Sequence, residues 1–196
     1  MGSGRVKVGK PNVGLHRNRR PRVLRSSILE LLAGGDRRSI GRADKVAAIV
    51  SKNPALFPGL IDGFWSEDPL VRMRAADAAE KASRKNPGLL APHKAELLGL
   101  MAETGQQELR WHLAVMVPRL VLNAKERQRA AAFLKDYLDD RSSIVKTFAL
   151  QGLADLGQQD PDMRVPVIDL LHRAECSGTP AMKARSRKLL AQLERD

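Results

Sequence analysis

Cysteine, aromatic residues and long apolar runs are all scarce in this chain of 196 residues. The single cysteine, Cys176, excludes an intrachain disulfide framework and a zinc site built from several cysteines. No apolar run approaches the roughly 18 residues that a membrane span needs. The first positive charges are not followed by the apolar stretch of a secretory signal. These absences predict a cytoplasmic protein that does not act in a membrane.

Phe, Trp and Tyr together make up only 4% of the residues, whereas Ala and Leu are abundant. Strands favour aromatic and β-branched side chains, and helices favour Ala and Leu. The hydrophobic share of 43% is enough to build a core. The composition therefore predicts an all-α globular fold.

Acidic residues are missing from the first 25 positions, which hold eight Lys and Arg. They supply +8 of the net charge of +12, and the rest of the chain supplies only +4. Gly, Pro and Arg dominate this stretch without apolar periodicity, which predicts a basic, flexible arm over residues 1–23 and a helical domain over 24–196. Such an arm can contact nucleic acid or an acidic protein, and a merely solvated tail is the alternative.

Helix boundaries are marked by two kinds of start signal and by several stops. Three starts place a capping Asp or Thr before proline, at Asp68-Pro69, Asp160-Pro161 and Thr179-Pro180. Two others are capping boxes, Ser27 with Glu30 and Asn123 with Glu126. Stops are predicted at Gly34-Gly35, Asn53-Pro54, Asn86-Pro87, Thr104-Gly105 and Gly157. The predicted helices are about 10–17 residues long.

Internal repetition is the strongest pattern in the sequence. Segments 71–76, 109–114, 145–150 and 182–187 align without gaps, and each starts with an apolar residue followed by a base. These bases, spaced by 38, 36 and 37 residues, are Arg72, Arg110, Lys146 and Lys183. A leucine lies 12 residues before each of them, at Leu60, Leu98, Leu134 and Leu171. A period near 37 with two helices per unit indicates a HEAT or TPR array, in which stacked pairs share one core.

The second helix of the first complete unit has one clear apolar face. Val71, Ala75, Ala79 and Ala82 follow one another at spacings of 4, 4 and 3, so they share one side of a helix. Small alanines on that side predict that neighbouring helices approach closely. Pro118 lies within the corresponding helix of the next unit and predicts a kink there.

Residues 68–76, with the sequence D-P-L-V-R-M-R-A-A, resemble the D-P-x-V-R-x-x-A turn and second helix of a HEAT repeat. Residues 86–98 resemble the first helix of such a repeat with its leading proline, and the Trp, Gly and Tyr pattern of TPR units is missing. The resemblance implies a right-handed α-α solenoid of about four to five HEAT-like helix pairs. Its predicted units are a degenerate cap at 24–53 and repeats at about 54–86, 87–122, 123–158 and 159–196.

In HEAT proteins the second helices line the inner surface, so the resemblance implies that the four repeated bases form a basic ladder beside a concave groove. The resemblance also implies an alternative, in which each base bonds an acid of an adjacent turn, here Asp68, Glu108 and Asp139 or Asp140. Under the first hypothesis the ladder contacts phosphates or an acidic partner. The predicted binding residues are Arg72, Arg74, Arg110, Trp111, His112, Lys146, Lys183 and Arg185.

Two further features allow more than one interpretation. Asp77 with Lys81 and Glu80 with Arg84 have the favourable spacing of helix ion pairs, which indicates a solvated face. The two tryptophans, Trp65 and Trp111, either pack between repeats or anchor a partner.

Catalytic motifs are missing. The four histidines are scattered without a metal-binding spacing, and neither a glycine-rich phosphate loop nor a G-x-S-x-G elbow occurs. The sequence therefore predicts no catalytic residue, metal or cofactor. The preferred hypothesis is a non-catalytic HEAT-repeat adaptor for a protein or peptide. The alternative is nucleic-acid binding through the arm and the basic ladder. Some bacterial DNA glycosylases are HEAT-like, and this chain is similar to them in fold class and basic helices only.

Overall fold

The computed structural model describes residues 28–36 and 39–195, and all regular structure in these ranges is helical. After a helical turn at 28–30 the helices are α2 (Ala43–Lys52), α3 (Phe57–Asp62), α4 (Pro69–Lys85), α5 (Lys94–Glu103), α6 (Gln107–Met116), α7 (Ala124–Asp136), α8 (Ser143–Gln159), α9 (Pro161–Ser177) and α10 (Pro180–Leu193). Short 3-10 turns occur at Pro54–Leu56, Gly63–Trp65, Pro87–His93, Val117–Arg119 and Tyr137–Asp139. The all-α prediction is confirmed. None of the described helices has the length and apolar character needed to cross a membrane.

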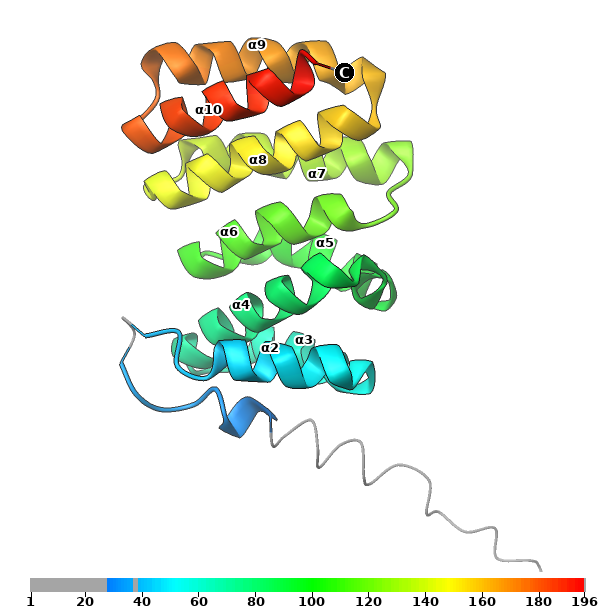
Figure 1. The fold of residues 1–196 in the computed structure, drawn as a ribbon, viewed down its shortest axis with the longest axis vertical. Coiled ribbons are helices and arrows are strands. Elements are labelled where there is room, and N and C mark those ends of the chain that lie inside the picture. The colour runs from blue at the N-terminus through cyan, green and yellow to red at the C-terminus, as the bar shows by residue number, and fades with distance from the viewer. Residues whose placement is uncertain (1–27, 37–38, 196) are drawn as a thin grey trace, which may run out of the picture.

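The helices stack in chain order along the long axis of the molecule, as Figure 1 shows. Helix α4 packs against α2 and α6, α6 packs against α8, and α8 packs against α10. Behind them lie α3, α5, α7 and α9, each packed against the helix that follows it in the chain. The front of the stack, built from α4, α6, α8 and α10, is called the second-helix face below.

The core lies between these two layers and runs the length of the stack as one connected cluster. Close packing depends on small residues as well as large ones, because Gly152 of α8 lies directly over the backbone of α6. The positions that the repeat pattern assigned to the core are all buried, namely Val71, Ala75, Ala79, Ala82, Leu60, Leu98, Leu134 and Leu171.

Most start signals in the sequence are confirmed by their hydrogen bonds. Asp68 caps α4 by accepting from the backbone N–H of Leu70 at 2.8 Å, and Asp160 and Thr179 cap α9 and α10. Asn123 and Glu126 form both bonds of a capping box, each 2.9 Å long. Ser27 and the arm at 1–23 lie outside the described residues.

Three expectations about helix ends are wrong. Helix α8 does not stop at Gly157 but continues to Gln159. Pro118 does not kink a helix, because α6 already ends at Met116 and the proline lies in the 3-10 turn that follows. A proline lacks the N–H that would continue the helix, so ending the helix avoids an unsatisfied carbonyl. Helix α3 has only six residues, fewer than the predicted minimum, and 3-10 turns extend it at both ends.

Candidate functional site

The first two members of the basic ladder hold turns together. Arg72 donates to the carbonyl oxygen of Ser66 and to the side chain of Gln106, both at 2.5 Å. Arg110 donates to the carbonyl of Thr104 at 2.8 Å and forms an ion pair with Asp140 at 2.6 Å. Each arginine therefore joins the turn before its own helix to the turn before the next second helix. Only Arg110 does so through an acid, as the structural alternative predicts, since the partners of Arg72 are carbonyl oxygens and Gln106.

The other two members of the ladder, Lys146 and Lys183, are half-buried. Neither ammonium group forms a hydrogen bond or ion pair with another residue in the described part of the chain. The ladder thus divides into two structural arginines at one end and two lysines whose ammonium groups remain able to bind a partner.

Arg74 does not belong to a binding surface, contrary to the sequence prediction. Its side chain is only 2% exposed, and its guanidinium donates to four carbonyl oxygens, those of Leu32, Gly34, Asp36 and Ser39. Residues 32–36 and 39–41 surround this cation and cover it. Arg74 therefore serves the fold at this end of the stack.

The environments of His112 and the two tryptophans bear on the predicted binding surface. Burial lowers the pKa of His112 to about 4, so this residue is neutral near pH 7 and adds no positive charge to the predicted stripe. Trp65 does not pack between repeats; it is 54% exposed and donates to Glu96 of α5 at 2.6 Å. Trp111 is half-buried and packs against the core on the second-helix face.

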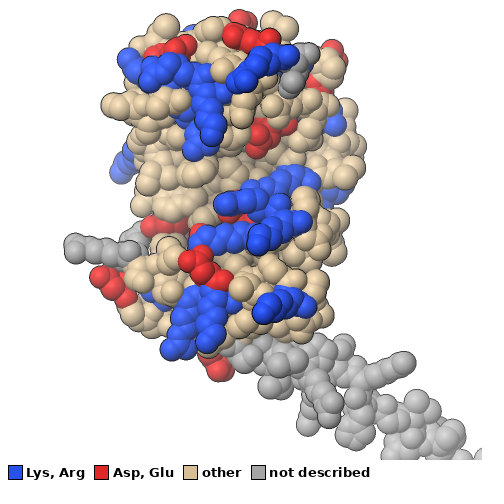
Figure 2. All heavy atoms as spheres, viewed as in Figure 1, with Lys and Arg blue, Asp and Glu red and all other residues tan. Residues whose placement is uncertain are grey.

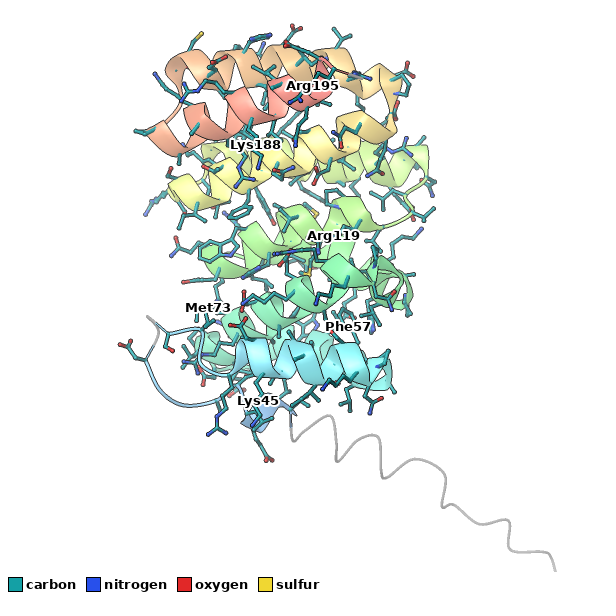
Figure 3. All side chains as sticks on the ribbon, in the orientation of Figure 1. Lys45, Phe57, Met73, Arg119, Lys188 and Arg195 are labelled. Carbon is teal, nitrogen blue, oxygen red and sulfur yellow. The ribbon has the colours of Figure 1, made fainter. Side chains whose placement is uncertain are left out.

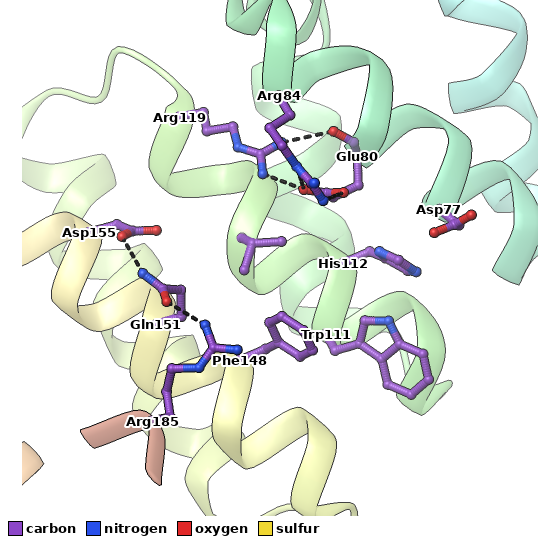
Figure 4. A pocket seen from close by; sticks show the side chains of 11 residues that line it. Asp77, Glu80, Arg84, Trp111, His112, Arg119, Phe148, Gln151, Asp155 and Arg185 are labelled. Carbon is purple, nitrogen blue, oxygen red and sulfur yellow. Dashed lines mark hydrogen bonds and ion pairs between the residues drawn. The ribbon is translucent and has the colours of Figure 1, made fainter. Parts of the chain in front are cut away.

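A cleft of about 410 Å³ opens on this face, between α6 and α8 and beside α4 and α10 (Figure 4). Its apolar floor is formed by Trp111, Val115 and Phe148, and charged side chains surround that floor. Three of the predicted binding residues, Trp111, His112 and Arg185, lie in this cleft. It is lined by Asp77, Glu80, Arg84, Trp111, His112, Val115, Arg119, Phe148, Gln151, Asp155 and Arg185.

One end of the cleft is closed by a buried carboxylate between two arginines. Glu80 receives ion pairs from Arg84 on its own helix, at 2.6 Å, and from Arg119 after α6. Arg119 also donates to the hydroxyl of Ser83 at 3.0 Å. Burial opposes ionisation of Glu80, but the hydrogen bonds from the two arginines outweigh it, and its pKa lies below the usual value of 4.5.

The opposite wall carries an arginine, a glutamine and an aspartate in a hydrogen-bonded row. Arg185 donates to the amide oxygen of Gln151 at 2.7 Å, and the amide nitrogen of Gln151 donates to Asp155 at 2.8 Å. The guanidinium of Arg185 lies 5.5 Å from the ring centre of Phe148, within cation-π range. Burial raises the pKa of Asp155, and the bond from Gln151 only partly offsets this effect.

Replacing Glu80 with glutamine should destabilise the fold by about 2 kcal/mol at pH 7, because it leaves Arg119 without its counter-charge. Since the folded pKa of Glu80 is depressed, its ionised form stabilises the protein above pH 4.5 and loses this effect as pH falls through the folded pKa. The gap between the urea midpoints of Glu80→Gln and the parent should therefore narrow at pH 3. Glu103→Gln, on an exposed residue, is the control; an equal loss there would contradict the pairing.

Eight cleft residues were not predicted as site residues: Asp77, Glu80, Arg84, Val115, Arg119, Phe148, Gln151 and Asp155. A signal was available, because counting from the ladder base gives positions two, five and nine as one helical stripe. In the second unit this stripe holds His112 and Val115 of α6 and Arg119 of the turn that follows, and in α8 it holds Phe148, Gln151 and Asp155. Glu80 and Arg84 lie outside the stripe. The sequence prediction used only the second position of this stripe, and there it included only basic residues and histidine. It therefore missed Phe148 and all residues at the fifth and ninth positions.

A scan of protein-family models and a search of curated proteins each found no match to this chain. Within residues 28–36 and 39–195, no three His, Cys, Asp or Glu side chains gather closely enough to hold a metal ion. The arguments below therefore start from the geometry of the cleft.

Proposed function

We propose that this chain is a non-catalytic scaffold that binds an acidic segment of a protein partner across its second-helix face. An apolar side chain of that segment occupies the cleft and rests on Trp111, Val115 and Phe148. The observation that supports this most directly is the apolar floor inside a charged rim. Protein interfaces commonly place such an anchor pocket at their centre and polar groups around it.

The charge of the second-helix face favours an acidic partner. Figure 2 shows Lys and Arg gathered over α10 at one end and over the α2, α4 and α6 end, with a less charged band between them. Lys45, Arg119, Lys188 and Arg195 all lie on the side seen in Figure 3. Complementary charge raises association rates and selects against like-charged partners. An acidic segment with an apolar residue near its middle would match this distribution.

The scaffold itself is proposed to be a HEAT-like solenoid. Three features support this: the 36- to 38-residue spacing of the ladder bases, the ordered stacking of α4, α6, α8 and α10, and the repeated ties from Arg72 and Arg110 to the next turn. Stacked pairs of this kind present a rigid surface, so little ordering is needed on binding.

Tryptophan fluorescence can test the anchor, because Trp65 and Trp111 are the only tryptophans. A full-length Trp65→Phe protein is used to select from a random peptide library. Selected peptides should carry acids around an apolar residue and should shift the emission of Trp111. Phe148→Ala should weaken their binding at least about tenfold. In the control protein Trp111→Phe, the emission of Trp65 should not change.

The anchor proposal fails if the selected peptides bind Phe148→Ala as tightly as the parent, or if they change the emission of Trp65. Circular dichroism melts of each variant separate a lost anchor from a lost fold, since Phe148 is only partly buried and packs at the edge of the core.

Nucleic-acid binding is the second candidate, and α10 supplies the observation that favours it. The charged side-chain groups of Lys183, Arg187 and Lys188 form no hydrogen bond with other residues of the described chain, so all three can contact phosphates. Affinity for DNA or RNA would then fall steeply as salt rises. Changing Lys183 and Lys188 to alanine would reduce that salt dependence. A complex that is insensitive to salt argues against this candidate.

The glycosylase alternative requires an acid and an aromatic side chain in one groove, and Asp155 and Phe148 meet that minimum. Base release from alkylated DNA, compared between the parent and Asp155→Asn, tests it directly. Under the proposed scaffold function neither protein releases a base.

A further inference from the structure

The row Arg185–Gln151–Asp155 presents a donor and an acceptor to the cleft, one on each side of the Gln151 amide. The amide oxygen of Gln151 accepts from Arg185, and one of its amide N–H groups donates to Asp155 (Figure 4). Gln151 therefore holds both side chains in place. Among the described residues, the second carboxylate oxygen of Asp155 and the other guanidinium nitrogens of Arg185 form no hydrogen bond. These atoms remain available to a bound group.

The other charges of the cleft are already matched. Asp77 pairs with Lys81 at 2.7 Å, and Glu80 pairs with Arg84 and Arg119. Arg185 and Asp155 are thus the two charged groups of the cleft that the structure does not join in an ion pair. A ligand that reaches this wall meets one strong donor and one strong acceptor.

Simple ions fit this wall poorly. A carboxylate that bonds Arg185 is repelled by Asp155, and an ammonium that bonds Asp155 is repelled by Arg185. The backbone of one extended residue satisfies both, because its N–H donates, its C=O accepts, and the two point to the same side of the chain. Since Asp155 is buried enough for its pKa to be raised, hydrogen bonds at this wall are also less weakened by water.

We propose that Arg185, Gln151 and Asp155 form an amide clamp for the backbone of the partner segment. Arg185 donates to the backbone C=O of one residue, Asp155 accepts from the N–H of the same residue, and Gln151 holds the two in register. The guanidinium of Arg185 lies over Phe148, so the side chain of the clamped residue falls on the apolar floor. This inference rests on the proposed function and adds to it the group that fixes the orientation of the bound chain.

The test uses two small probes of the same skeleton, N-acetyl-leucine N-methylamide (the amide) and the analogue in which an ester oxygen replaces the leucine N–H (the ester). Full-length Trp65→Phe protein labelled with ¹⁵N gives one indole N–H signal, that of Trp111, which reports occupation of the cleft. The amide should bind at least about fivefold more tightly than the ester, because the ester leaves Asp155 without a donor.

Asp155→Asn separates the clamp from the floor. The asparagine oxygen still accepts from Gln151, so its amino group replaces the free carboxylate oxygen and faces the ligand N–H. The preference for amide over ester should vanish, because the amide loses its acceptor and binds at least about fivefold more weakly than to the parent. Asp169→Asn, on an exposed residue of α9, should keep the preference.

Each of the other possible results contradicts a specific part of the proposal. Equal binding of amide and ester by the parent overturns the clamp but leaves the apolar anchor intact. Failure of both probes to move the Trp111 signal up to their solubility limits overturns the anchor and the clamp together. Tighter binding of free 4-methylpentanoate overturns the clamp in favour of a carboxylate site. If uridine moves the signal at lower concentration than the amide, the cleft selects a nucleobase instead of a peptide.

Discussion

Replacing Gly152 with alanine is expected to lower the thermal midpoint by about 10 °C. A Cβ at this position would lie 2.2 Å from the backbone oxygen of Ala114 and 3.1 Å from both methyl groups of Leu134. A backbone oxygen cannot rotate away, so α8 must move off α6. Overpacking of this kind costs about 3 kcal/mol, and each kcal/mol corresponds to roughly 2–4 °C for a chain of this size.

Gly99→Ala is the matched control for this change. Gly99 lies inside α5, and a Cβ there meets no atom within 4 Å. Alanine is favoured over glycine within a helix by about 1 kcal/mol, so this variant should melt higher than the parent. The two variants are compared by thermal melts followed by circular dichroism and by the midpoints of urea unfolding. Similar shifts in both variants would show that α6 and α8 are not as close as described.

Arg74→Ala is expected to have the second largest effect, a loss of about 2–3 kcal/mol in the free energy of unfolding. The substitution leaves the carbonyls of Leu32, Gly34, Asp36 and Ser39 without their donor and opens a void beneath them. Each buried acceptor left unsatisfied costs about 1–3 kcal/mol, although release of the segment to water limits the total.

The site of proteolytic cleavage distinguishes the local role of Arg74 from a general effect of losing one positive charge. Limited proteolysis of Arg74→Ala should cut first within residues 32–42, because Arg74 fastens that segment to α4. Arg187→Ala removes the same charge from an exposed position of α10 and should change neither the midpoint nor the cleavage pattern. If both variants behave alike, Arg74 does not hold the segment.

The features that the sequence predicted correctly are local ones. Caps such as Asp68 and the box of Asn123 with Glu126 depend on residues two or three positions apart. The buried stripe of α4 depends on spacings of three and four within one helix. Such patterns are visible without knowing which helices are neighbours.

The errors arose where a distant segment decides the environment of a residue. Arg74 holds the same position in its helix as His112, Phe148 and Arg185, and those three line the cleft. At the end of the stack residues 32–36 and 39–41 cover this position instead. Glu80 was assigned to a solvated face because its partner Arg84 is on the same helix. Its second partner, Arg119, comes from 39 residues further along the chain.

The side-chain bonds between neighbouring units span similar lengths of chain. Arg119 and Glu80 are 39 residues apart, Gln159 and Pro118 are 41 apart, and Tyr137 and Met101 are 36 apart. Each junction therefore closes a short loop whose entropy does not depend on how many units precede it. Adding a helix pair at either end would lengthen the second-helix face by roughly 8–10 Å without altering existing junctions. The size of the surface and the chemistry of the cleft can thus change independently.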